Sequence, residues 1–149
     1  MRELPRQLSA EQLAELFEGR TRFVDRLAAV DDPLAHARDV ARALPDDEKK
    51  EVLDAHPAIG GRPTSATSAR EQGTDDDPAV LAELAELNRA YEQKFGFRFV
   101  VFVNRRPRRE IVPILRERLE RTRGEELETG VDELVQIALD RFQRSSGEH

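Results

Sequence analysis

The stretch DPAVLAELAELNRAYEQKFG, residues 77–96, decides the fold. Its apolar side chains recur at helical spacing, at Leu81, Leu84, Leu87, Tyr91 and Phe95. Asp77 followed by Pro78 is typical of a helix start, and Gly96 suits a helix stop. The stretch therefore predicts one long amphipathic helix.

The segments on either side repeat this apolar period and predict more helices. Ser9 and Gln12 form a capping box before the first helix, and Gly19 suits its end. The further helices are expected near residues 21–30, 32–44, 46–56, 107–121 and 124–143. Pro113 lies inside one of them, so we expect that helix to kink or to start late.

Residues 97–103 are the one segment that resembles a strand. No second strand candidate can pair with it, so we interpret it as a buried extended or irregular segment. The prediction is an all-α fold of about six to eight helices. One compact domain spanning residues 1–149 is expected, because the chain has the length of one ordinary domain.

The composition excludes several kinds of site. The chain has no Cys and three His, so it has neither a thiol nucleophile nor a thiolate metal site, and no zinc motif. No glycine-rich phosphate loop is present. We therefore expect no metal and no cofactor.

The charge and hydropathy patterns bear on partners and location. The net charge of −6 disfavours nucleic acid as a partner. The basic cluster at residues 105–109 is a local exception, for which a solvated loop is the preferred interpretation over a phosphate contact. The longest apolar run, residues 99–103, is too short to span a membrane, and the N-terminus lacks the apolar core of a signal peptide. We expect a cytoplasmic protein.

A long polar segment rich in Gly, Ser and Thr, residues 57–77, follows His56. Long loops inside compact domains are often functional. His56 stands directly before Pro57, which fixes the local turn, and imidazole titrates near neutrality. The alternative is a helix C-terminal histidine that the helix dipole favours.

The same segment contains Ser68, Glu71 and Gln72 within one helical turn. A hydroxyl, a carboxylate and an amide so close together can cradle a small polar ring. The alternative is a second capping box, in which Ser68 caps a helix and Glu71 stands three residues later.

Arg141 continues the apolar stripe of the last helix, which consists of Leu127, Val131, Leu134 and Ala138. A charge on a buried seam needs a partner or a ligand. The alternative is that Arg141 reaches solvent while Phe142 takes the inward place.

Taken in order, these stretches resemble the OHCU decarboxylase family, which acts on 2-oxo-4-hydroxy-4-carboxy-5-ureidoimidazoline. The residues that carry the resemblance are His56-Pro-Ala-Ile-Gly60, Ser68-x-x-Glu71-Gln72, Leu87-Asn88-x-x-Tyr91-x-x-Lys94-Phe95-Gly96-Phe97-x-Phe99, and Arg141. The resemblance implies an all-α, cofactor-independent carboxy-lyase of urate degradation, often a dimer, that yields (S)-allantoin.

The resemblance also implies roles for individual residues. His56 would donate or accept the catalytic proton, Glu71 would be its acidic companion, and Arg141 would meet an anionic or carbonyl oxygen of the substrate. The ring would be held by Pro57, Ser68, Gln72 and the main chain of Phe99, Val100, Val101, Phe102 and Val103.

Two alternatives stay open at this point. The first is an enzyme of the same fold that acts on another small ureide or ring acid. The second is a helical binding module without catalysis, in which the 57–77 loop is a recognition surface. A pocket with a His–Glu pair favours an enzyme, and a flat charged surface favours the module.

Overall fold

The computed structural model describes residues 4–56, 77–104 and 106–145. For residue 145 it describes the backbone and not the side chain. These residues form helices and contain no strand, which confirms the all-α prediction. The helices are α1 (Ala10–Phe17), α2 (Arg22–Ala28), α3 (Pro33–Ala43), α4 (Asp46–Asp54), α6 (Pro78–Phe95), α7 (Arg108–Leu119) and α8 (Arg123–Ser145). In this part of the chain no helix has the length and apolar character needed to cross a membrane.

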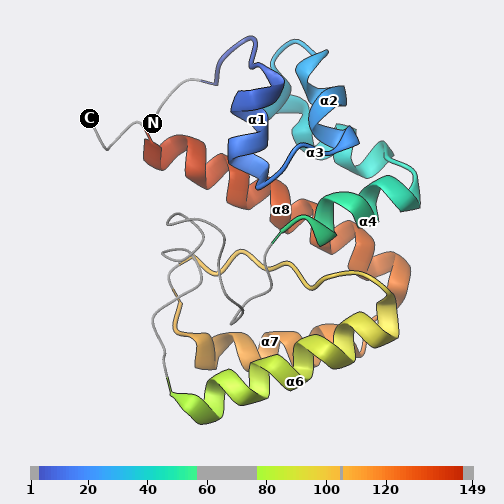
Figure 1. Cartoon of the computed structure of the whole chain (residues 1–149), viewed down its shortest axis with the longest axis vertical. Helices are drawn as coiled ribbons and strands as arrows, with labels where there is room; N and C mark the ends of the chain where they lie inside the picture. Colours follow the sequence, from blue (N-terminus) through green and yellow to red (C-terminus); the bar gives the residue numbers. More distant parts are fainter. Residues whose placement is uncertain (1–3, 57–76, 105, 146–149) are drawn as a thin grey trace.

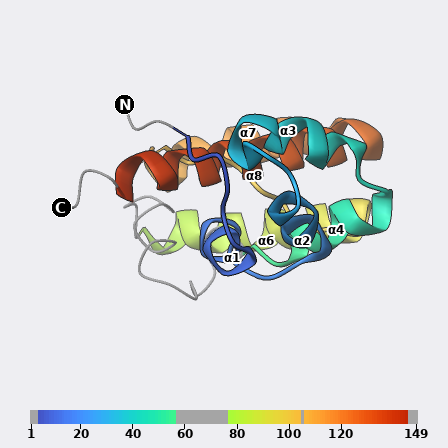
Figure 2. The same cartoon turned by 90° about the horizontal axis from the view of Figure 1, so that it is seen from above.

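The long helix α8 runs through the middle of the molecule (Figure 1). Helices α1 to α4 gather on one side of it, and α1, α3 and α4 pack directly against α8. Helices α6 and α7 pack against each other on the other side, and the extended segment 97–103 passes between the two groups (Figure 1). Seen from above, α3 lies alongside α8 (Figure 2).

Most helix ends lie where the sequence places them. Ser9 and Gln12 form the predicted capping box, and the Asp77 carboxylate accepts the Ala79 N–H at 2.9 Å. Gly96 ends α6 with a φ of 82°, which a glycine adopts without a Cβ clash. The end of α1 differs from the prediction, because Glu18 and not Gly19 takes the left-handed position, with a φ of 65°.

Helix α7 corrects the expectation of a late start. It begins at Arg108 and continues through Pro113. Pro113 is exposed and so is Arg109, whose carbonyl loses its helical donor, so water can replace that bond. The opposite face of the helix is held by the buried side chains of Ile111, Val112 and Leu115.

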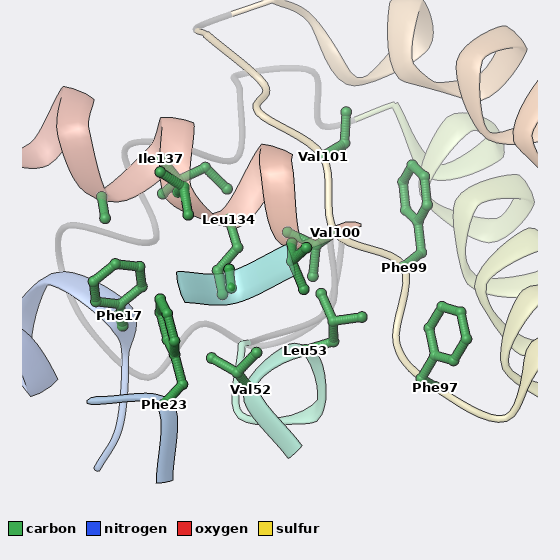
Figure 3. Close-up of a cluster of buried hydrophobic side chains, with 14 of the residues drawn as sticks. Phe17, Phe23, Val52, Leu53, Phe97, Phe99, Val100, Val101, Leu134 and Ile137 are labelled. Carbon is green, nitrogen blue, oxygen red and sulfur yellow. The ribbon is translucent and has the colours of Figure 1, made fainter. Parts of the chain in front are cut away.

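The segment 97–103 is buried and extended, as predicted, and it joins the two helical groups. Phe97 and Phe99 point to the α6 side, where their rings lie 5.9 and 5.3 Å from the ring of Tyr91 (Figure 3). Val100 points the other way, towards Leu53 (Figure 3). The main chain expected to contact a substrate therefore lies between the apolar side chains of the α6 side and those of the α4 side.

Candidate functional site

His56 lies just after α4, where its N–H donates to the Leu53 carbonyl at 3.2 Å. The side chain is partly buried, and its Nδ1 atom is fully buried with no hydrogen-bond partner among the described residues. A buried polar atom left without a partner costs roughly 1–3 kcal/mol. Such an atom is expected where a ligand or a catalytic partner completes the site.

Arg98 connects the extended segment to the end of α4. Its Nη1 donates to the carbonyls of His56 at 2.6 Å and Asp54 at 3.2 Å. Its backbone N–H donates to Asp54 Oδ1 at 3.0 Å. Arg98 was not predicted as a site residue, although a charged residue between Phe97 and Phe99 is a signal present in the sequence.

Arg141 is 6% exposed, so the alternative in which it reaches solvent is wrong. Its Nη1 donates to the Leu16 carbonyl at 2.9 Å, and its Nη2 lies 3.1 Å from Glu18 Oε1. Phe142 is also buried, so both side chains lie inward. Arg141 is therefore a buried cation with a partner, Glu18, that the sequence did not reveal, and its contact with a substrate oxygen stays a prediction.

The surroundings of His56 favour the neutral imidazole. The pKa of His56 is lowered from 6.5 to about 4, first by burial and then by the positive charges of Arg141 and Arg98, while Glu18 acts in the opposite direction. A histidine stabilised by a helix C-terminus would instead have a raised pKa. The electrostatics therefore run against the alternative of a dipole-favoured cation and suit a proton acceptor at neutral pH.

Four predicted site residues, Pro57, Ser68, Glu71 and Gln72, lie outside the described residues. The prediction that His56 and Glu71 face one pocket therefore stays a prediction.

The main chain of residues 99–103 is fixed by a side chain of α7 and by one from the loop that directly follows the segment. Arg118 donates to the Val100 carbonyl at 2.7 Å. Arg106 donates to the carbonyls of Phe102 at 2.6 Å and Val103 at 2.9 Å. Arg106, in the basic cluster, is thus half-buried and structural, which corrects the interpretation as a solvated loop for this member.

A second buried cluster joins α6, α7 and α8. Glu126, which is fully buried, accepts from the Tyr91 hydroxyl at 2.7 Å, from Arg118 Nε at 2.7 Å and from Arg121 Nη1 at 2.9 Å. The Arg118 guanidinium lies 4.6 Å from the centre of the Phe99 ring. Burial and the Glu126 hydrogen bond raise the pKa of Tyr91. Tyr91 therefore has a structural role in this arrangement.

Metal-binding groupings of His, Asp and Glu do not occur within the described ranges. The candidate site thus consists, in this part of the chain, of a neutral histidine, a buried arginine and a rigid stretch of main chain. Proton transfer and anion binding are what these groups can supply.

The profile of the OHCU decarboxylase family matches residues 2–143. The chain belongs to the OHCU decarboxylase family. The crystal structure described as OHCU decarboxylase in the presence of (S)-allantoin superposes with a TM-score of 0.78 and 26% identity, covering 95% of this chain and 100% of that one.

Curated relatives agree with this family. The 2-oxo-4-hydroxy-4-carboxy-5-ureidoimidazoline decarboxylase of Xenopus laevis is 31% identical over 108 residues, which are 66% of this chain and 62% of that protein. The uric acid degradation bifunctional protein TTL of Arabidopsis thaliana is 35% identical over 97 residues, 58% of this chain. The match spans 30% of the Arabidopsis protein, so this chain corresponds to a part of it.

Proposed function

We propose that this protein is a carboxy-lyase that converts 2-oxo-4-hydroxy-4-carboxy-5-ureidoimidazoline (OHCU) into (S)-allantoin and carbon dioxide in urate degradation. The observation that carries the proposal is the buried imidazole nitrogen of His56, which has no hydrogen-bond partner among the described residues, in a chain of this family. The relatives that share the fold are named for this reaction or for its product.

The reaction needs no cofactor, because the substrate contains its own electron sink. The carbon that loses carboxylate also carries a hydroxyl, and its ring neighbour is an imine carbon. When the C–C bond breaks, its electron pair forms a C=C bond and the imine π pair moves to nitrogen, which takes a proton. The hydroxyl then becomes a carbonyl as its proton leaves, and the former imine carbon gains a proton on one face. Carbon dioxide and allantoin are the products.

Each step has a candidate residue. A neutral His56 accepts the hydroxyl proton or delivers the proton to carbon, and Glu71 holds or recharges the imidazole. Arg141 meets an anionic or carbonyl oxygen, as a fixed cation in a buried site does best. Pro57, Ser68, Gln72 and the main chain of residues 99–103 hold the ring so that the carboxylate leaves out of the conjugated plane.

The setting is proposed from the same resemblance. We infer a cytoplasmic enzyme in which residues 1–149 act as one domain, with a second copy of the chain as its partner in a homodimer. Neither nucleic acid nor membrane is a proposed partner.

The test mixes the pure protein with freshly generated OHCU and follows the circular dichroism of the allantoin formed. The expected result is (S)-allantoin at a rate that survives exhaustive chelation. Activity that vanishes with a chelator and returns with a divalent metal would refute cofactor independence. No acceleration would leave another ureide, or a binding module, as the function.

The matched variant is His56→Ala, with His36→Ala as the control because His36 is exposed on α3. Removing a positioned acid–base group lowers kcat/KM by about a hundredfold or more. The residual product should be racemic, since spontaneous decay controls no face. A folded His56→Ala protein with near wild-type rate and unchanged product chirality would exclude the mechanism.

A further inference from the structure

A buried ion pair joins the end of α1 to the last turns of α8. Arg141 Nη2 lies 3.1 Å from Glu18 Oε1, and the two side chains are 4% and 8% exposed. The Leu16 carbonyl accepts from Arg141 Nη1 at 2.9 Å. The guanidinium is therefore held at two of its nitrogens by groups at the end of α1, which fixes both its position and its orientation.

The left-handed backbone conformation of Glu18 indicates that its side chain has a role that glycine could not fill. Glu18 ends α1 in the left-handed region, with a φ of 65°. This conformation is unfavourable for a residue with a Cβ and is usually taken by glycine. The end of the helix by itself thus favours glycine at position 18. A glycine would lack the carboxylate that pairs with Arg141.

The pair also acts on His56. Among the described residues, the charged groups that influence this imidazole are Arg141 from α8, Glu18 from the end of α1, and Arg98 from the extended segment. Glu18 is the anion among these three. Without it, two cations would face a partly buried imidazole whose Nδ1 has no partner in the described part of the chain.

We propose that Glu18 is a positioning residue of the active site, which holds the Arg141 guanidinium in place near His56 and offsets its charge. This inference rests on the proposed function for its catalytic consequence. The N-terminal helix α1 then contributes to the site, although the sequence motifs of the site all lie after residue 55.

The first measurement is steady-state decarboxylation by Glu18→Gln. Glu48→Gln is the matched control, because the Glu48 side chain is 7% exposed and pairs with Arg26 at 2.7 and 2.8 Å, yet it does not influence His56. We expect kcat/KM to fall by about tenfold to a hundredfold in Glu18→Gln, since small displacements of a positioning group have effects of this size. Glu48→Gln should stay within about twofold of wild type, because it perturbs stability without touching the site.

The second measurement needs no substrate. The pKa of the His56 imidazole is followed by NMR in wild type, Glu18→Gln, Arg141→Gln and Glu48→Gln. Removing the cation should raise that pKa, removing the anion should lower it, and the control should leave it in place. A purely structural Glu18 would move stability and leave this titration where it is.

Glu18→Gly covers the case in which Glu18→Gln does not fold, because it removes the carboxylate while relaxing the left-handed backbone. A folded Glu18→Gly or Glu18→Gln with the kcat/KM and the His56 titration of the Glu48→Gln control would overturn the proposal. A wild-type protein without activity on OHCU would refute the proposed function alone, since opposite His56 shifts in the two variants test the coupling without substrate.

Discussion

Two buried arginine–glutamate pairs stand near opposite ends of α8, and their surroundings differ. Near the start of the helix, Glu126 receives donors from Arg118, Arg121 and Tyr91, so both carboxylate oxygens are bonded. Near its end, Arg141 bonds Glu18 and acts on a neutral histidine. The first pair is built into a network that joins three helices, whereas the second stands beside the group proposed to move a proton.

The contrast separates two uses of a buried charge. Desolvation of two ions is repaid only when hydrogen bonds satisfy the remaining donors and acceptors. The Glu126 network meets this condition at both carboxylate oxygens, and Arg118 Nη1 also fixes the Val100 carbonyl, whereas Arg118 Nη2 has no partner among the described residues. The Glu18 pair instead places a cation where it acts on His56. We therefore expect damage to the first pair to appear mainly in folding and damage to the second mainly in catalysis.

The largest expected effect on stability follows from breaking the network. Arg118→Ala removes a guanidinium that is 7% exposed in its side chain and leaves the fully buried Glu126 with fewer donors. Loss of one partner of a buried pair costs about 3–5 kcal/mol. Urea denaturation followed by circular dichroism measures the change.

The control for this variant lies two residues away on the same helix. Arg116 pairs with Glu83 at the surface, with side chains 59% and 39% exposed. Arg116→Ala should cost less than about 1 kcal/mol, as exposed pairs do. Equal losses in the two variants would contradict the assignment of the Glu126 network as a structural device.

The next effect concerns acid stability and His56. Its folded pKa is about 4 against 6.5 when unfolded, so the unfolded chain binds the extra proton first as pH falls. The free energy of unfolding is therefore unaffected by His56 above pH 6.5. Between pH 6.5 and pH 4 it falls progressively, by about 3 kcal/mol in all, as the unfolded chain gains the proton.

Urea denaturation at several pH values between 7 and 4 measures this loss. His56→Gln should flatten the pH dependence in that window, whereas His36→Gln, on an exposed residue, should retain it. An unchanged slope in His56→Gln would mean that other groups cause the acid sensitivity.

The helices, their caps and the buried extended segment were predictable because their signals are local. Apolar spacing of three and four residues specifies a helix face, and Asp77-Pro78 and Gly96 mark the ends of α6. Arg141 was predictable for the same reason, since it interrupts an apolar stripe. The same argument applies to Arg118, which continues the buried face of Ile111 and Leu115 and was not used.

The partners of these arginines were not predictable, because they are distant in the chain. Leu16 and Arg141 are 125 residues apart, and nothing in the local pattern of Glu18 distinguishes it from the exposed glutamates Glu11 and Glu15 of α1. The end of α1 was misassigned to Gly19 for a related reason. Backbone preference favours glycine there, and a tertiary ion pair outweighs that preference.

The smallest expected effect refines the comparison within the network itself. Tyr91→Phe removes one of the hydrogen bonds that Glu126 accepts, and the carboxylate keeps those from Arg118 and Arg121. Hydrogen bonds to charged groups contribute about 1.5–3 kcal/mol, and we expect about 1.5 kcal/mol here because the carboxylate stays bonded.

Tyr91 is the one tyrosine and the chain has no tryptophan, so ultraviolet absorbance of tyrosinate reports this hydroxyl directly. Because the folded pKa of Tyr91 is raised above 10, stability should fall as pH rises past 10, and tyrosinate should form together with alkaline unfolding. Ionisation of Tyr91 near pH 10 in the folded protein would show that the hydroxyl is not held by Glu126, and the network would then be reduced to its two arginines.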